Sequence, residues 1–198
     1  TGRRTLHPPG PRSGHRPLST TAPISVGAGV YVGRMQLTAD EVDRFWSRVV
    51  KGPRETDCWL WAGGGTAAIG DDGYGRFWVS REGRPRVLRP HRVAWALAEG
   101  VSIDLPPVVE HVVCDNPICV RAEGTLLDHL EGSTQAANLS RIAQHGRRGA
   151  RGYRSRMFGR EAMYRRSLAL RAAVADGWDD ERIARALASL DEAQMALF

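Results

Sequence analysis

The sequence has few cysteines and no long apolar run, and each shortage excludes a class of protein. Three cysteines in 198 residues are too few, and odd in number, for a secreted disulfide scaffold, which leaves metal binding or burial as small apolar side chains. No apolar run approaches the ~20 residues of a membrane-spanning helix. The glycine-broken segment 22–33 lacks the apolar centre and cleavage site of a signal peptide. We therefore expect an intracellular protein without a membrane partner.

Lysine is almost absent, because Lys51 is the single lysine among 28 basic residues. The formal charge is nevertheless +6 and the isoelectric point about 9.9. Such an excess favours a polyanionic partner, since a protein that neutralises phosphates gains affinity by releasing their counterions. The guanidinium group is a planar fork that suits phosphate oxygens. A basic surface without a polyanionic partner is the alternative.

The first 34 residues contain no acidic residue and many prolines, glycines and arginines. This composition predicts a disordered basic arm over 1–37. Met35 lies directly before the first well-formed element, which favours a start site assigned too far upstream. The length fits one domain with appendages, so we predict a core domain over 38–150 and an arginine-rich helical extension over 151–198.

The predicted domain mixes helices with short strands. Thr38 and Glu41 form a capping box that begins a helix over 37–50, whose apolar face includes Val49. A second helix ends at Gly100. Between these two helices, short aromatic or β-branched segments predict the strands of an antiparallel meander: 58–61, 73–80 and 84–88.

A strand–strand–helix order follows. The segment 108–113 predicts a strand that carries His111, and 129–133 predicts a second strand that begins at His129. The next segment predicts a helix that carries Asn138, that Ser133 or Thr134 caps, and that Gly146 ends.

The window from Arg141 to Arg171 holds ten arginines and one acidic residue, interleaved with aromatics. A solvated surface is the ordinary explanation of a charge run, but this imbalance favours a segment that contacts nucleic-acid phosphates. Two further helices are predicted over 164–175 and 179–190, joined by 176–178. A plain helical hairpin is favoured over a DNA-binding helix-turn-helix, because no clear recognition helix follows. The arginines expected to contact DNA are Arg141, Arg147, Arg148, Arg151, Arg154 and Arg156.

Cys114 and Cys119 flank an Asp-Asn-Pro turn in the segment EHVVCDNPIC. Thiolate and imidazole are the ligands that zinc prefers, and alone the pair fits a metal site and two buried thiols about equally. Cys58 and a histidine from a flanking strand shift the balance toward metal. We interpret the other two histidines of this region, His91 and His145, as hydrogen-bonded structural residues, with phosphate contact an alternative for His145.

Six segments occur here in an order that resembles the HNH endonucleases of phages and mobile elements: CWLW, GYGRF, PHRVAW, EHVVCDNPICV, HLEGSTQAAN and the arginine-rich tail. The resemblance covers roughly Phe45 to Arg151, and the cysteine and histidine spacing is similar to that of His-Cys box homing endonucleases. It implies an α+β fold with a ββα-metal (His-Me finger) core, an antiparallel β meander, a structural zinc and a helical C-terminal extension.

The resemblance also implies a role for each site residue. His111 matches the general base, and Asn138 and Glu110 match ligands of a catalytic divalent cation such as Mg²⁺. Arg76 matches an arginine that stabilises the strained phosphate. The ligands implied for a structural zinc are Cys58, Cys114, Cys119 and His129. The connection 120–128 is longer than is usual in the family.

The function expected from this pattern is metal-dependent hydrolysis of phosphodiester bonds in DNA, most readily double-stranded DNA, in the cytoplasm of a bacterial or phage-infected cell. The ends expected are 5′-phosphate and 3′-hydroxyl. Two alternatives stay open: a non-catalytic zinc-stapled DNA-binding protein, and a binder or nuclease directed to RNA. His111 together with Asn138 favours a nuclease, because a zinc module needs neither residue.

Overall fold

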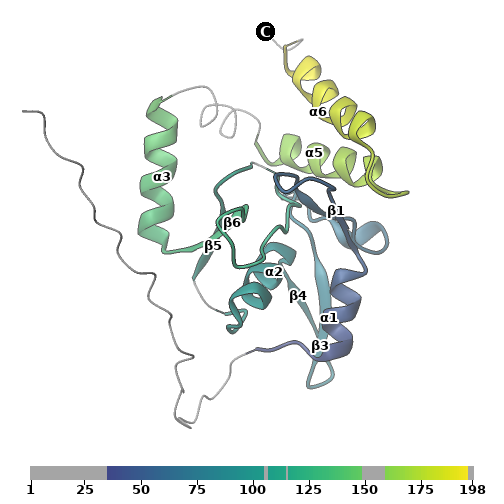
Figure 1. Ribbon diagram of the computed structural model, residues 1–198, viewed down its shortest axis with the longest axis vertical. Helices are drawn as coiled ribbons and strands as arrows, with labels where there is room; N and C mark the ends of the chain where they lie inside the picture. The colour runs from purple at the N-terminus through teal and green to yellow at the C-terminus, as the bar shows by residue number, and fades with distance from the viewer. Residues whose placement is uncertain (1–34, 105–106, 115, 149–158, 196–198) are drawn as a thin grey trace, which may run out of the picture. The chain divides into compact units, whose positions relative to one another are not determined.

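The computed structural model describes residues 35–104, 107–114, 116–148 and 159–195 (Figure 1). The described part is a mixed α+β structure with small antiparallel sheets, which confirms the predicted class. Its elements are α1 (Ala39–Trp46), β1 (Val49–Lys51), β2 (Trp59–Trp61), a 3₁₀ turn η1 (Thr66–Ala68), β3 (Phe77–Arg81), β4 (Arg84–Leu88), α2 (Pro90–Glu99), β5 (Val108–His111), β6 (Leu130–Ser133), α3 (Gln135–Arg148), α5 (Gly159–Ala173) and α6 (Asp180–Met195). Residues 1–34 of the predicted arm lie outside the described residues.

The strands pair two by two, as β1–β2, β3–β4 and β5–β6. The predicted meander over 58–88 is therefore wrong, because β2 pairs with β1, with Trp61 opposite Val49, while β3 and β4 form a separate hairpin. The cause is the segment between the first helix and β2. Its valines are β-branched, so they favour an extended strand and provide β2 with a partner that the prediction had assigned to the helix.

The first helix begins as predicted and ends early. The Thr38 hydroxyl accepts a hydrogen bond from the Glu41 amide, and the Glu41 carboxylate accepts one from the Thr38 amide. The helix ends at Trp46, where Ser47 is the C-cap. Val49 thus belongs to β1 and not to the apolar face of α1.

Helix α2 ends at Gly100, as predicted, in the left-handed conformation (φ 64°) that glycine adopts without strain. Of the two predicted caps of α3, Thr134 is the one used, because its hydroxyl accepts a hydrogen bond from the Ala137 amide. Helix α3 continues past Gly146 to Arg148, so the predicted end is wrong. Glycine is compatible with helical dihedrals, and ends a helix only where the chain turns.

Three fully buried aromatic rings form the centre of the core. Phe45 of α1, Trp61 of β2 and Phe77 of β3 lie with ring centroids 5.3 to 5.7 Å apart. Leu170 of helix α5 and Val174, directly after the helix, belong to the same cluster, and α5 packs against β2 and α6. The hairpin α5–α6 therefore shares the core that carries the metal-site segments, and truncating a buried leucine such as Leu170 to alanine costs about 2–5 kcal/mol.

Candidate metal centre and neighbouring histidine site

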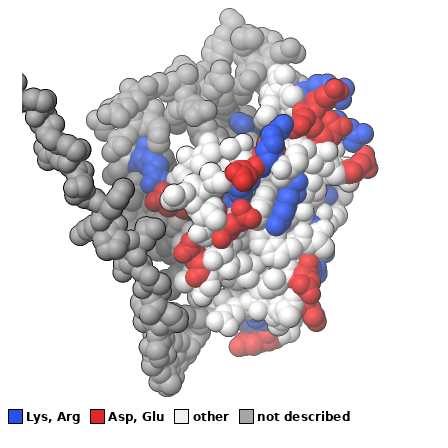
Figure 2. Space-filling view, in the orientation of Figure 1, with Lys and Arg blue, Asp and Glu red and all other residues white. Residues whose placement is uncertain are grey.

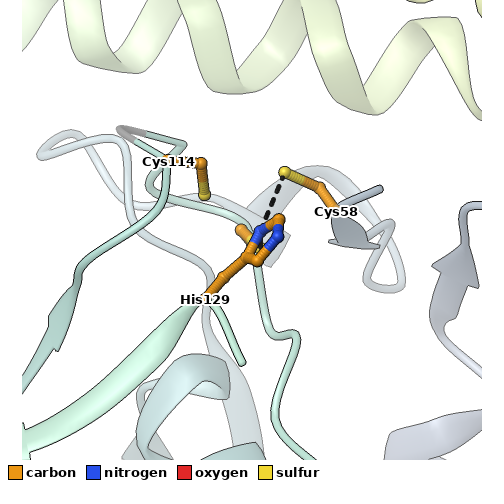
Figure 3. Close-up of side chains that lie close together, drawn as sticks. Cys58, Cys114 and His129 are labelled. Carbon is orange, nitrogen blue, oxygen red and sulfur yellow. Dashed lines mark hydrogen bonds between the residues drawn. The ribbon is translucent and has the colours of Figure 1, made fainter. Parts of the chain in front are cut away.

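Four predicted zinc ligands come together in the structure. The ligand atoms of Cys58, Cys114, Cys119 and His129 all lie within 4.8 Å of one another. His129 Nδ1 lies 3.5 Å from the sulfur of Cys58 and 3.5 Å from that of Cys119. Figure 3 shows Cys58, Cys114 and His129 pointing toward one another from separate segments of the chain.

This donor set fits zinc. A tetrahedral zinc with Zn–S distances of about 2.3 Å requires sulfurs about 3.8 Å apart, so a small contraction of the cluster suffices. The set can therefore hold a metal ion, and its three thiols and one imidazole are consistent with zinc. The prediction of a metal site at these four residues is confirmed in that sense.

The segment around Cys119 reaches the cluster by pairing with β2. Ile118 accepts a hydrogen bond from the Trp61 amide, and the Val120 amide donates to the Trp59 carbonyl. Leu60 and Cys119 form an isolated antiparallel bridge. Because Cys58 directly precedes β2, this pairing places two sulfurs side by side that are far apart in the sequence.

The long connection 120–128 is closed on itself. The Asp128 carboxylate accepts hydrogen bonds from the amides of Glu123 and Gly124, at 2.8 and 2.9 Å, and from the Thr125 hydroxyl. The buried Arg121 side chain donates to the carbonyl oxygen of Leu127. The extra residues therefore form a loop whose two ends are held together, and the chain returns His129 to the metal centre.

Removing the Asp128 carboxylate is expected to loosen this loop. We expect Asp128→Ala to destabilise the protein by about 1.5–3 kcal/mol. This is the usual contribution of hydrogen bonds to a charged group, and the mutation also leaves the amides of Glu123 and Gly124 without their partner. The mutation should also speed zinc loss to a chelator. Thermal unfolding and chelator competition measure both effects. Asp176→Ala, at an exposed acidic residue paired with Arg182, is the control and should change stability by less than about 0.5 kcal/mol. Equal behaviour of the two variants would contradict the closing role of Asp128.

The three thiols cannot all ionise without a cation. Hydrogen bonds from Cys114 and Cys119 lower the pKa of Cys58 to about 2. The Cys119 thiol lowers the pKa of Cys114, but the neighbouring Cys58 thiolate and burial outweigh it and raise that pKa to about 12. Burial, followed by the two other sulfurs, raises the pKa of Cys119 well above its usual value. A divalent cation supplies the positive charge that lets the second and third thiolates form.

His111, the predicted general base, lies at the end of β5 and is tied to the metal centre. Its Nε2 lies 3.0 Å from the carbonyl oxygen of Cys119. A carbonyl oxygen only accepts, so Nε2 carries the proton and the lone pair of the neutral ring is on Nδ1. The backbone of Cys119, one of the four residues of the candidate metal centre, thus fixes the orientation of this imidazole.

The sequence interpretation missed that His91 lies between His111 and Tyr74, in contact with both rings. The His91 ring lies 5.5 Å from the His111 ring and 5.3 Å from the Tyr74 ring, between centroids. His91 is 8% exposed, and its Nδ1 makes no hydrogen bond within the described part, so the expected hydrogen bond at that atom is absent. Burial holds the pKa of His91 well below its usual value, and a positive charge on the neighbouring His111 ring would lower that pKa further. The sequence signal was weak, because a histidine after Pro90 at a helix start is ordinary.

Within the described part of the chain, Glu110 pairs through its carboxylate with Arg141 and not with Asn138. Its side chain is 10% exposed, and Oε1 lies 3.3 Å from Nη1 of Arg141. Arg141 lies equally close, 3.3 Å, to the carboxylate of Glu131, which is directly opposite Glu110 across β5–β6. Asn138 is partly buried on α3, three residues before Arg141 and therefore on the same side of the helix.

The described ion pair of Arg76 is with Asp71 and not with a residue of the histidine pair. Its guanidinium pairs with the exposed Asp71 carboxylate at 3.1 Å and is about one third exposed. Arg76 follows Tyr74 by two residues, and the Tyr74 ring contacts His91. The predicted phosphate-stabilising arginine is thus on the segment that reaches the histidine pair, with its charge directed to Asp71.

The arginines expected to contact DNA are only partly described. Arg151, Arg154 and Arg156 lie outside the described residues, and so do the side chains of Arg147 and Arg148. Further along, described arginines bind within the protein: Arg165 pairs with Glu161 and Arg171 donates to the carbonyl oxygens of Ala62 and Gly65. On the face in Figure 2, basic and acidic side chains are interspersed.

In the described residues, no helix combines the length and the apolar character needed to cross a membrane. Comparison of the chain with protein-family models, with curated proteins and with solved structures finds no match.

Proposed function

We propose that this protein is a metal-dependent HNH-type endonuclease that hydrolyses phosphodiester bonds in DNA. The observation that carries the proposal is the position of His111, whose Nε2 is bound by the carbonyl oxygen of a metal-centre cysteine. A purely structural zinc module has no need of an imidazole oriented in this way. In the proposed nuclease, this ring is the general base.

The order of elements supports the same proposal. An antiparallel pair, β5–β6, carries His111 at the end of its first strand, and α3 follows directly and carries Asn138. Helix α3 lies against β5. This order is the one that the resemblance to ββα-metal nucleases implies, and the connection between the strands contributes three of the four zinc ligands.

Each residue has a defined part in the proposed reaction. Nδ1 of His111 takes a proton from the attacking water, whose oxygen forms a bond to phosphorus while the bond from phosphorus to the 3′ oxygen breaks. A bound divalent cation would stabilise the negative charge that develops on the departing 3′ oxygen, which then takes a proton from solvent to become the 3′-hydroxyl. Glu110 and Asn138 offer the oxygen ligands that such a cation prefers, and the Arg76 guanidinium balances the phosphate charge. The zinc, with four protein ligands, is structural.

Plasmid cleavage tests the proposal. Purified full-length protein with Mg²⁺ is expected to convert supercoiled plasmid into nicked or linear DNA, and EDTA is expected to stop the reaction. The products should carry 5′-phosphate and 3′-hydroxyl ends, which DNA ligase rejoins. Binding to DNA in a gel-shift assay without cleavage of any DNA would overturn the nuclease in favour of the zinc-stapled DNA-binding protein. Cleavage of RNA alone would favour the RNA-directed alternative.

A further inference from the structure

Arg141 is in an unusual position between two carboxylates. Its Nη1 lies 3.3 Å from Glu110 Oε1 and 3.3 Å from Glu131 Oε2, and neither contact has the geometry of a hydrogen bond. Guanidinium N–H groups are directional donors, and a well-placed arginine would bind a carboxylate with two aligned bonds. The position between the two carboxylates is thus occupied by Nη1 of Arg141, which makes no aligned hydrogen bond to either of them.

Glu110 has a buried carboxylate of which one oxygen, Oε1, lacks a hydrogen bond. Its side chain is 90% buried, its Oε1 accepts none, and this ion pair is the contact that compensates its charge. The facing Glu131 adds a second negative charge, and like charges directly across an antiparallel pair repel. A spherical cation has no directional requirement, and carboxylate oxygens are its preferred ligands. The position therefore suits a divalent cation better than it suits Arg141.

We propose that Arg141 and a divalent cation compete for the position between Glu110 and Glu131, and that a substrate phosphate opens this position by drawing Arg141 away. The Arg141 side chain is 31% exposed, so a phosphate can reach the guanidinium from solvent. Glu131 then becomes a cation ligand beside Glu110. The inference rests on the proposed function in taking that phosphate to be part of a nucleic acid.

The competition makes a direct prediction about metal affinity without DNA. Zinc-loaded full-length Arg141→Ala is expected to bind Mn²⁺ at least about fivefold more tightly than the wild type, within the usual range for coupled sites. Arg141→Gln, which keeps a long polar side chain, should show the same gain, and Arg141→Lys should stay close to the wild type because the charge remains. Electron paramagnetic resonance of free Mn²⁺ measures the affinity.

Matched variants separate the local effect from net charge. Arg165→Ala also removes one positive charge, but from an exposed pair with Glu161, and should leave Mn²⁺ affinity unchanged. In the Arg141→Ala background, Glu131→Gln should abolish the gain, whereas Glu161→Gln should not. Equal affinities of Arg141→Ala and Arg165→Ala would overturn the competition. A gain that survives Glu131→Gln would overturn the assignment of Glu131, and absence of Mn²⁺ binding in every variant would overturn the cation position.

If DNA raises the affinity for the cation, the cation must raise the affinity for DNA by the same factor, so the coupling can be measured through DNA binding. In the wild type, Ca²⁺ should raise the affinity for a short DNA duplex in fluorescence anisotropy, and in Arg141→Ala that rise should disappear. Arg165→Ala is the control for the loss of one positive charge and for the ionic strength of the added Ca²⁺, and Ca²⁺ should still raise its affinity for DNA. If metal binding depends on Arg141 but the protein cuts no DNA, the proposed competition stands and the proposed nuclease function is overturned. If the wild type cuts DNA but its Mn²⁺ affinity does not depend on Arg141, the nuclease function stands and the competition is overturned.

Discussion

His111→Ala is expected to slow plasmid cleavage by about 10²- to 10⁴-fold, the usual contribution of a positioned general base. The reason is local: the Nε2 hydrogen bond to Cys119 leaves Nδ1 as the proton acceptor, and alanine offers none. DNA binding should change little, because the imidazole is proposed to act on the water. Single-turnover cleavage at saturating Mg²⁺ measures the rate.

Two further variants sharpen that test. His111→Gln can still donate to the Cys119 carbonyl oxygen but offers no basic nitrogen, so we expect a loss similar to that of alanine. Val112→Ala changes the exposed neighbouring side chain and should cut at the wild-type rate. Zinc content of each variant confirms that the metal centre has formed. Wild-type rates in both His111 variants would show that another group is the base.

Cys119→Ala is expected to abolish zinc binding and to unfold the segment between β5 and β6. The wild type should contain about one tightly bound zinc per chain by elemental analysis. Structural zinc sites contribute apparent free energies of about 10–16 kcal/mol in small zinc-dependent domains, which is comparable with the whole stability of a domain. Hydrogen exchange should therefore rise strongly over 112–129, and removal of zinc from the wild type should have the same effect.

Val120→Ala is the matched control for that variant. Val120 is as fully buried as Cys119 and adjacent to it, but it offers no ligand. This variant should lose some stability through the cavity and keep its zinc. Purified wild-type protein without zinc, or a Cys119→Ala protein with wild-type exchange rates, would return the three cysteines to the role of buried thiols.

The parts of the structure that the sequence predicted depend on local chemistry. The capping pair Thr38 and Glu41 and the C-cap Gly100 are encoded within one or two turns of helix. The four residues of the candidate metal site could be predicted because thiol and imidazole groups are few in this chain and both favour zinc. The Asp-Asn-Pro sequence between Cys114 and Cys119 also predicted a turn that brings these two sulfurs together.

The parts that the sequence did not predict depend on distant contacts. Strand β1 exists because Val49 meets Trp61, and no local pattern separates that valine from the end of a helix. Arg141 was assigned to DNA by its place in a basic run, whereas its described partners are carboxylates on β5 and β6. The contact of His91 with His111 joins α2 to β5, which neither segment encodes alone.

The self-closed loop 120–128 has a practical use. Its tip residue Leu126 is fully exposed, and Asp128 holds its ends together near the metal centre. Doubling the length of such a loop costs only about 0.6 kcal/mol in closure entropy. A peptide tag or fluorophore inserted at the tip would therefore label this protein at a point separated from the candidate metal site by the length of the loop, and the spacing of Cys114, Cys119 and His129 in space would stay unchanged.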